Sequence, residues 1–94
     1  MSGRQLNEEW TARVVGRMHK YRISRAELAS KCHYSLTYIS LVLNGNKEFK
    51  SEYAKQKTRE KIERNLKEIE DGILEEIKAK EAQEEKWYEY FNKT

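Results

Sequence analysis

The stretch from Ser24 to Gly45 constrains the fold most, because it holds the start and stop signals of two short helices. Ser24 and Glu27 can satisfy each other's free backbone N–H at the start of a helix. Ser35 offers a second start, and Gly45 accepts the left-handed conformation that ends a helix. The apolar positions between these signals have helical spacing: they are Leu28, Ala29 and Cys32, then Ile39, Val42 and Leu43. The stretch predicts two capped helices of about nine residues joined by a tight turn, a helix-turn-helix.

The same stretch resembles the helix-turn-helix of the phage repressor and Cro family, also called the xenobiotic-response-element family. The resemblance lies in 18 residues, LASKCHYSLTYISLVLNG, where the family pattern is matched at Leu28-Ala29, Ser35, Ile39-Ser40 and Asn44-Gly45. His33 departs from the pattern, since the family usually has a turn glycine there, but His is among the residues that tolerate a positive φ. The resemblance implies an all-α, lambda-repressor-like domain.

The second helix of the pair, Ser35–Leu43, would by resemblance be the recognition helix that enters the major groove of double-stranded DNA. The candidate DNA-binding residues are Arg25, Leu36, Thr37, Tyr38, Ser40, Leu41, Asn44 and Lys47. All but Arg25 and Lys47 are expected on the exposed side of the helix, because its apolar stripe faces inward.

The resemblance also implies a role for each of these positions. Base reading would come from the residues at four of them: Leu36, Thr37, Ser40 and Leu41. Arg25 would begin the preceding helix near the DNA backbone, Asn44 would contact a phosphate, and Lys47 would add charge. No Arg, Gln or Asn stands early in the recognition helix, so specificity would rest on methyl contacts and DNA shape.

The charge of the chain is uneven. Residues 1–50 hold nine Lys and Arg against four Asp and Glu, a net charge of +5. Residues 51–94 hold ten against twelve, a net charge of −2. A basic first half that carries such a helix pair suits a polyanionic partner.

The sequence lacks the motifs of catalysis and of metal or cofactor binding, so we expect no enzyme, no metal site and no cofactor. Its two His and one Cys have no ligand spacing, and Cys32 falls on an apolar helix face, as a core residue does. A single Cys favours a reducing compartment. There is no leader and no long apolar run, so we expect the bacterial cytoplasm or nucleoid and no membrane partner.

A further helix is expected before this stretch. It would begin at Glu8 after a cap at Asn7, whereas residues 1–6 carry no pattern. Its apolar face follows from the spacing of Trp10, Val14 and Met18. Gly16 stands within it and suggests that another helix approaches closely there.

After a loop that Phe49 anchors, Ser51 is expected to cap a very long, highly charged helix. Its apolar positions are Tyr53, Ile62, Leu66, Ile69, Ile73 and Ile77. We expect the helix to complete the core up to about Ile69, and Gly72 to allow a bend. The predicted organisation is a helix-turn-helix domain over residues 7–69 and a helical extension over residues 70–94.

The extension carries an apolar seam with heptad-like steps and an aromatic end that a small core cannot cover. The candidate dimerisation residues are Ile69, Ile73, Ile77, Trp87, Tyr88 and Phe91. A homodimer would set two recognition helices one DNA turn apart, about 34 Å. The alternative is that the extension binds a different protein.

Two functions follow from these features. The first is a sequence-specific DNA-binding transcriptional regulator, a repressor of a phage or mobile element that acts as a dimer. The alternative is a protein-interaction adaptor, antitoxin-like or anti-defence, in which Leu36, Tyr38 and Leu41 form an apolar docking patch on the same scaffold.

Overall fold

Four α-helices form the part of the chain described by the computed structural model, namely the backbone of residues 2–92 and the side chains of residues 9–84 and 86. They are α1 (Ser2–Lys20), α2 (Arg25–Cys32), α3 (Leu36–Leu43) and α4 (Glu52–Asn92). No strand forms over residues 2–92, so the prediction of an all-α chain is confirmed.

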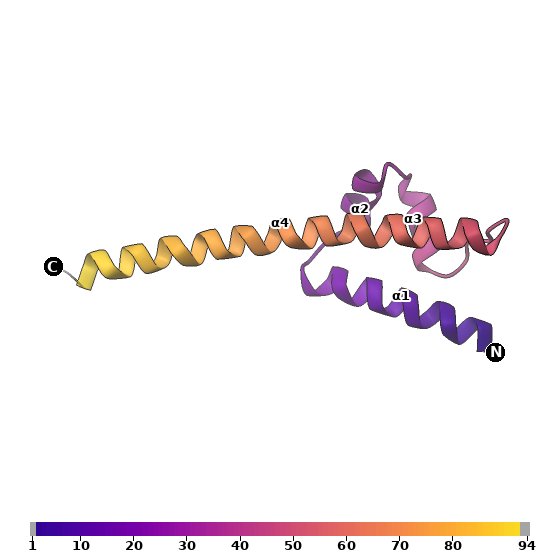
Figure 1. The fold of residues 1–94 in the computed structure, drawn as a ribbon, viewed down its shortest axis with the longest axis horizontal. Helices are drawn as coiled ribbons and strands as arrows, with labels where there is room; N and C mark the ends of the chain where they lie inside the picture. The colour runs from indigo at the N-terminus through magenta and orange to yellow at the C-terminus, as the bar shows by residue number, and fades with distance from the viewer. Residues whose placement is uncertain (1, 93–94) are drawn as a thin grey trace.

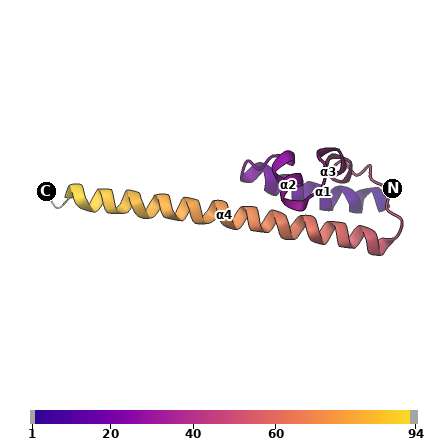
Figure 2. The same ribbon diagram turned by 90° about the horizontal axis from the view of Figure 1, so that it is seen from above.

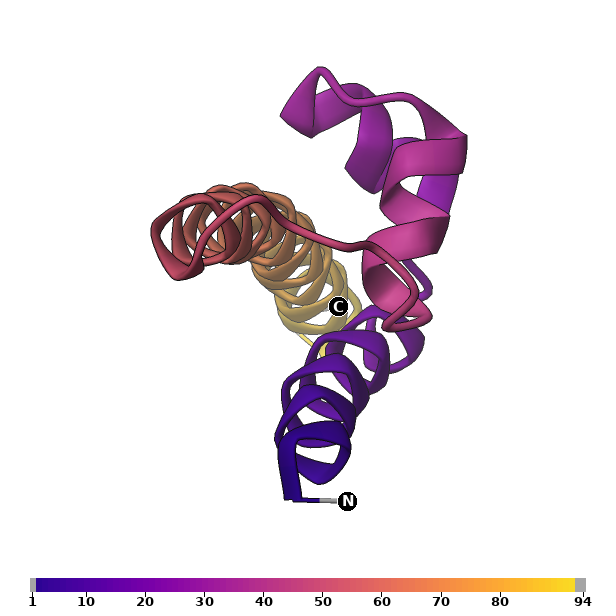
Figure 3. The same cartoon turned by 90° about the vertical axis from the view of Figure 1, so that its right-hand side faces the viewer.

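The first three helices gather along the first half of α4, and the second half of α4 runs on alone (Figure 1, Figure 2). Figure 3 looks along α4 and shows α1, α2 and α3 to one side of it. The molecule is therefore long, with extents of 66 × 27 × 19 Å. We call the part formed by α1, α2, α3 and the first half of α4 the helical body.

Helix α1 begins at Ser2, so the prediction of a start at Glu8 after a cap at Asn7 is wrong. Asn7 lies inside the helix. The sequence before it holds no proline, and its one glycine, Gly3, costs a helix only about 1 kcal/mol. Such a segment extends a helix that is already anchored further along.

The apolar face of α1 is the predicted one, since Trp10, Val14 and Met18 are all buried. Gly16 was expected to permit close helix packing, and this prediction is wrong. Among the described residues, no neighbouring heavy atom outside its own helix turn lies within 4 Å of the place where a Cβ would stand. Gly16 is exposed, and its face of the helix meets solvent.

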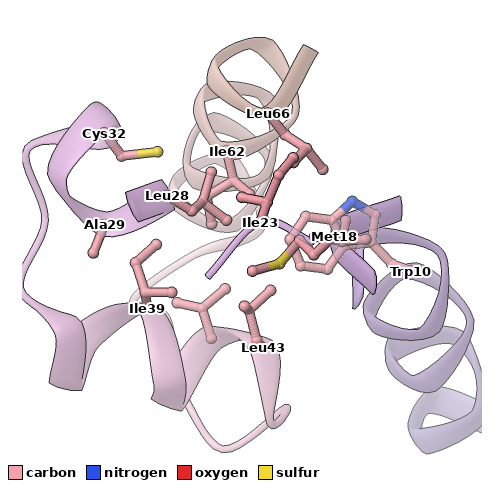
Figure 4. Close-up of a cluster of buried hydrophobic side chains, with 12 residues drawn as sticks. Trp10, Met18, Ile23, Leu28, Ala29, Cys32, Ile39, Leu43, Ile62 and Leu66 are labelled. Atoms are coloured by element: carbon pink, nitrogen blue, oxygen red, sulfur yellow. The ribbon is translucent and has the colours of Figure 1, made fainter. Parts of the chain in front are cut away.

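The hydrophobic core joins all four helices (Figure 4). Its buried members beyond α1 are Ile23, Leu28, Ala29, Cys32, Ile39, Val42, Leu43, Ile62 and Leu66. Helices α2 and α3 turn their predicted stripes toward α4, where Ile62 and Leu66 are fully buried. Burying a side chain of this size contributes about 1.5–3 kcal/mol, so this cluster is the main source of stability.

Polar contacts reinforce the pairing of α1 with α4. The Nε of Arg17 on α1 donates to Glu70 Oε2 at 3.0 Å, and its Nη2 donates to Glu70 Oε1 at 2.5 Å. The hydrogen bond with Glu70 raises the pKa of Arg17. Trp10 Nε1 donates at 3.0 Å to Oε1 of Glu63, which lies before Glu70 on α4. The helical body therefore holds α4 firmly as far as Glu70, which is itself buried.

The loop before α4 follows the prediction. Phe49 is half-buried against the core, and Ser51 Oγ accepts a hydrogen bond from the N–H of Ala54 at 3.1 Å. Tyr53 was expected among the apolar positions of α4 but is 70% exposed, because it falls on the side of the helix away from the core. The helix continues without interruption through Gly72.

Candidate functional site

Helices α2 and α3 are held at a fixed angle by a three-residue turn with defined hydrogen bonds. Ser24 Oγ accepts from the N–H of Glu27 at 3.0 Å, so the Ser24 half of the predicted cap of α2 is present. His33 then adopts the left-handed conformation, with φ 61° and ψ 34°. Its N–H donates to Ser30 O at 3.2 Å, and the N–H of Tyr34 donates to Ala29 O at 2.9 Å. This is the positive φ expected where the family pattern has glycine.

Helix α3 starts and ends on the predicted signals. Ser35 Oγ accepts from the N–H of Tyr38 at 3.0 Å. At the other end, Gly45 has φ 74°, and the N–H of Asn46 donates to Leu41 O at 2.9 Å. Ile39, Val42 and Leu43 are buried against the core. One face of this short helix is thereby fixed, and the other face is available for contact.

The outward face of α3 exposes two leucines. Leu36 is 52% exposed and Leu41 is 40% exposed. Thr37 and Asn44 are also exposed, as predicted, whereas Ser40, which was predicted to be exposed, is half-buried. Exposed leucines on a helix of eight residues have no role in the core, so this face is the best candidate for contact with another molecule.

Tyr38 does not belong to this face, so the prediction that it is exposed is wrong. It is half-buried against the core, and its ring centroid lies 4.6 Å from that of Tyr34. Its hydroxyl lies 3.4 Å from Thr58 Oγ1 on α4. A tyrosine at the edge of a helix stripe is long enough to reach the next helix, and here that reach turns it inward. Tyr38 braces α3 against α4.

Arg25 and Asn44, predicted to lie near DNA, are brought together although 19 residues separate them. Arg25 Nη1 donates to Asn44 Oδ1 at 3.2 Å and so joins the start of α2 to the end of α3. Lys47 follows shortly after, and its Nζ lies 5.6 Å from the centroid of the Tyr38 ring. These three residues form a polar, cationic border at the C-terminal end of α3.

Two basic residues of α4, which the sequence presented only as a charged helix, extend this border. Lys55 and Arg59 line a hollow of about 270 Å³ together with Lys47 and the end of α3. The guanidinium carbon of Arg59 lies 4.7 Å from the centroid of the Trp10 ring, and burial lowers the pKa of Arg59. Their spacing of four residues on α4 is the signal that points both side chains the same way.

The candidate dimerisation residues fall into three groups. Ile69 and Ile73 are partly buried against the core of their own chain, whereas Ile77 is 44% exposed. Leu74, which sequence reasoning missed, is 38% exposed beside them. The side chains of Trp87, Tyr88 and Phe91 lie outside the described part of the structure.

No group of three or more His, Cys, Asp or Glu among the described residues could hold a metal ion. Cys32 is fully buried, and burial raises the pKa of its thiol. None of the described helices is both long and apolar enough for a membrane span.

Comparison with known proteins finds no matching family model, no matching curated protein and no matching solved structure. The family resemblance therefore rests on the residues between Leu28 and Gly45 and on what they form.

Proposed function

We propose that this protein is a sequence-specific DNA-binding transcriptional regulator, a repressor of a phage or mobile element that acts as a dimer in the bacterial cytoplasm. In this proposal α2, the His33 turn and α3 form a lambda-repressor-like helix-turn-helix, and α3 enters the major groove. The observation that carries it is the outward face of α3, with exposed side chains over a helix whose other face is fixed in the core.

The chemistry of that face fits base reading by apolar contact. Leu36 and Leu41 suit thymine methyl groups and sugars, and Thr37 offers both a methyl and a hydroxyl. Cations at the C-terminal end of α3 suit the phosphates that flank a groove. These are Arg25, Lys47, Lys55 and Arg59. Phosphate contacts would set position and salt dependence, while α3 would supply the sequence preference.

The test begins with selection of preferred duplexes from a random pool by the purified full-length protein. Thr37→Ala and Leu41→Ala should then weaken binding to the selected site by about 1–3 kcal/mol, with little effect on random DNA. Tyr53→Ala is the matched control, since Tyr53 is a large exposed side chain on the far side of α4. Unchanged sequence preference in both α3 variants would contradict the proposal.

Salt dependence tests the cationic border separately. Eight contacts, four from each chain of a dimer, give a slope of about −7 in a plot of log affinity against log salt. Lys47→Ala should flatten this slope by about one unit per chain on selected and random DNA alike. Lys67→Ala, an exposed lysine on α4, serves as the charge-matched control and should leave the slope nearly unchanged.

A second candidate function is a protein-interaction adaptor, antitoxin-like or anti-defence. It is favoured by the exposure of Leu36 and Leu41 and by the lack of any charged side chain on α3 itself. An apolar protein partner would bind with a shallow salt dependence, so the same titration distinguishes the two functions.

A further inference from the structure

The apolar stripe of α4 continues past the helical body. Ile62 and Leu66 are fully buried under the first three helices, and Ile69 and Ile73 are partly buried at the edge of the body. Ile77, on the same side of the helix, is exposed. Beyond this point α4 runs on alone to Asn92 (Figure 2).

The sequence that continues this stripe along α4 has apolar positions placed symmetrically about its middle, where two opposite charges stand. Steps of four, three, four, three and four residues from Ile73 stay on one side of a helix, as in a coiled coil. The positions reached are Ile73, Ile77, Lys80, Glu84, Trp87 and Phe91. Two apolar positions thus stand at each end, with a lysine and a glutamate in the middle. Reversing the chain about position 82 exchanges 73 with 91, 77 with 87, and 80 with 84.

This symmetry distinguishes the two ways in which a second copy can lie along α4. A parallel copy in register would set Lys80 against Lys80 and Glu84 against Glu84, and like charges directly opposed are unfavourable. It would also need its own helical body where the first copy's α1, α2 and α3 already lie (Figure 3). An antiparallel copy instead sets each Lys80 against a Glu84 and each apolar position against an apolar one.

We propose that the stripe of α4 from position 73 to position 91 binds a second copy of this chain in antiparallel orientation, centred on Ala82. The partner's helix would then end at position 92 beside position 72, just where the helical body of the first copy ends. The inference specifies the partner geometry of the dimer in the proposed function, but the pairing itself requires no DNA.

The size of this contact is sufficient for a weak, specific dimer. The two helices overlap over positions 72–92, which is about 30 Å at 1.5 Å per residue. A paired length of this kind buries on the order of 1,200 Å² in total, the lower end of the range for specific interfaces. We therefore expect a micromolar dissociation constant.

Cysteine cross-linking of the full-length protein tests the orientation without DNA. In the antiparallel pair, the two copies of position 81 lie on the same flank of the helix pair and are offset by about 3 Å along the helix axis. The two copies of position 77 are about 15 Å apart along that axis. Glu81→Cys should therefore form a covalent dimer with a short bismaleimide, and Ile77→Cys should not. The native Cys32 is buried in the core, so the unmodified protein supplies the baseline.

A charge reversal gives a second, independent measurement. Lys80→Glu replaces two attractive pairs by two repulsive ones, so the dimer dissociation constant from sedimentation equilibrium should rise about tenfold or more. Mixing Lys80→Glu with Glu84→Lys should restore dimers, because the mixed pair again joins opposite charges.

Three results would overturn the inference: no link at position 81, a link at position 77, or a full-length protein that stays monomeric at about 100 µM, far above the expected micromolar constant. A protein that forms the position 81 link but does not bind DNA would count against the proposed function alone. The cross-linking result would still support the antiparallel pairing.

Discussion

The backbone conformation of His33 gives a prediction whose magnitude can be worked out from the structure. Its φ of 61° is in the left-handed region, which costs a non-glycine residue about 1–2 kcal/mol. Glycine relieves this strain but gives the unfolded chain more freedom, which offsets about 0.5–1 kcal/mol. His33→Gly should therefore stabilise the fold by about 0.5–1 kcal/mol. Its backbone hydrogen bonds in the turn stay available in the variant.

Two other positions serve as matched controls for the same physical effect. Arg22 also has a positive φ, 56°, so Arg22→Gly should stabilise the fold by a similar amount. Gly45 has φ 74°, and no neighbouring heavy atom of the described part lies within 4 Å of the place where its Cβ would stand. Gly45→Ala therefore tests backbone strain without a clash, and it should destabilise the fold by about 1 kcal/mol.

Urea unfolding at one fixed protein concentration measures these differences, since a dimer makes stability depend on concentration. For a slope near 1 kcal/mol per M, we expect midpoints to shift by about 0.5–1 M, upward for His33→Gly and Arg22→Gly and downward for Gly45→Ala. A lower urea midpoint for both His33→Gly and Arg22→Gly would refute the strain argument. A downward shift for His33→Gly alone would show that the imidazole itself stabilises the turn.

Two further predictions concern the body. Glu70→Gln leaves Arg17 without its charged partner, so it should lower the free energy of unfolding in urea by about 1–3 kcal/mol. This is less than for a fully buried pair, because Arg17 is partly exposed. The control is Glu68→Gln, at the more exposed pair with Lys31, which should lower it by under about 1 kcal/mol. Burial raises the pKa of Cys32, so at pH 8 its thiol should react with a disulfide reagent only at the rate of unfolding, and a rate like that of a free thiol would contradict the packing of α2.

The features that could be predicted from the sequence are those set by neighbours within a few residues. The caps at Ser24, Ser35 and Ser51 each use an N–H three residues on, and all three are present. Apolar spacing likewise predicted the buried stripes of α2 and α3. Both signals are local, because the geometry of one helical turn fixes which side chains and backbone groups meet.

The features that sequence reasoning missed depend on contacts between distant residues. Arg17 reads as a solvated cation until the fold brings Glu70, 53 residues away, to its guanidinium. Tyr38 reads as an exposed residue until α4 supplies Thr58. The positive φ of Arg22 lacks a glycine signal, and it arises where the chain leaves α1 and carries Ile23 into the core. Helical periodicity shows which side a residue faces, but not what covers that side.

The antiparallel dimer predicts a spacing between DNA half-sites that differs from the single turn suggested by the sequence. Helix α3 packs beside α4 near Thr58, which lies 24 positions before the proposed centre at Ala82. Two such lengths at 1.5 Å per residue separate the two recognition helices by about 72 Å along α4. Two turns of B-DNA measure about 68–72 Å, so selected sites should be inverted repeats with centres about 20–21 base pairs apart.

Spacer variants of a selected site provide the measurement. Adding about five base pairs between the half-sites rotates them to opposite faces of the DNA and should reduce the affinity to that of a single half-site. Lys80→Glu should reduce affinity for the intact site in the same way and leave binding to one half-site unchanged, because it weakens only the link between two chains. Half-sites one turn apart would contradict the antiparallel geometry, since the rigid length of α4 could not bring its two recognition helices that close.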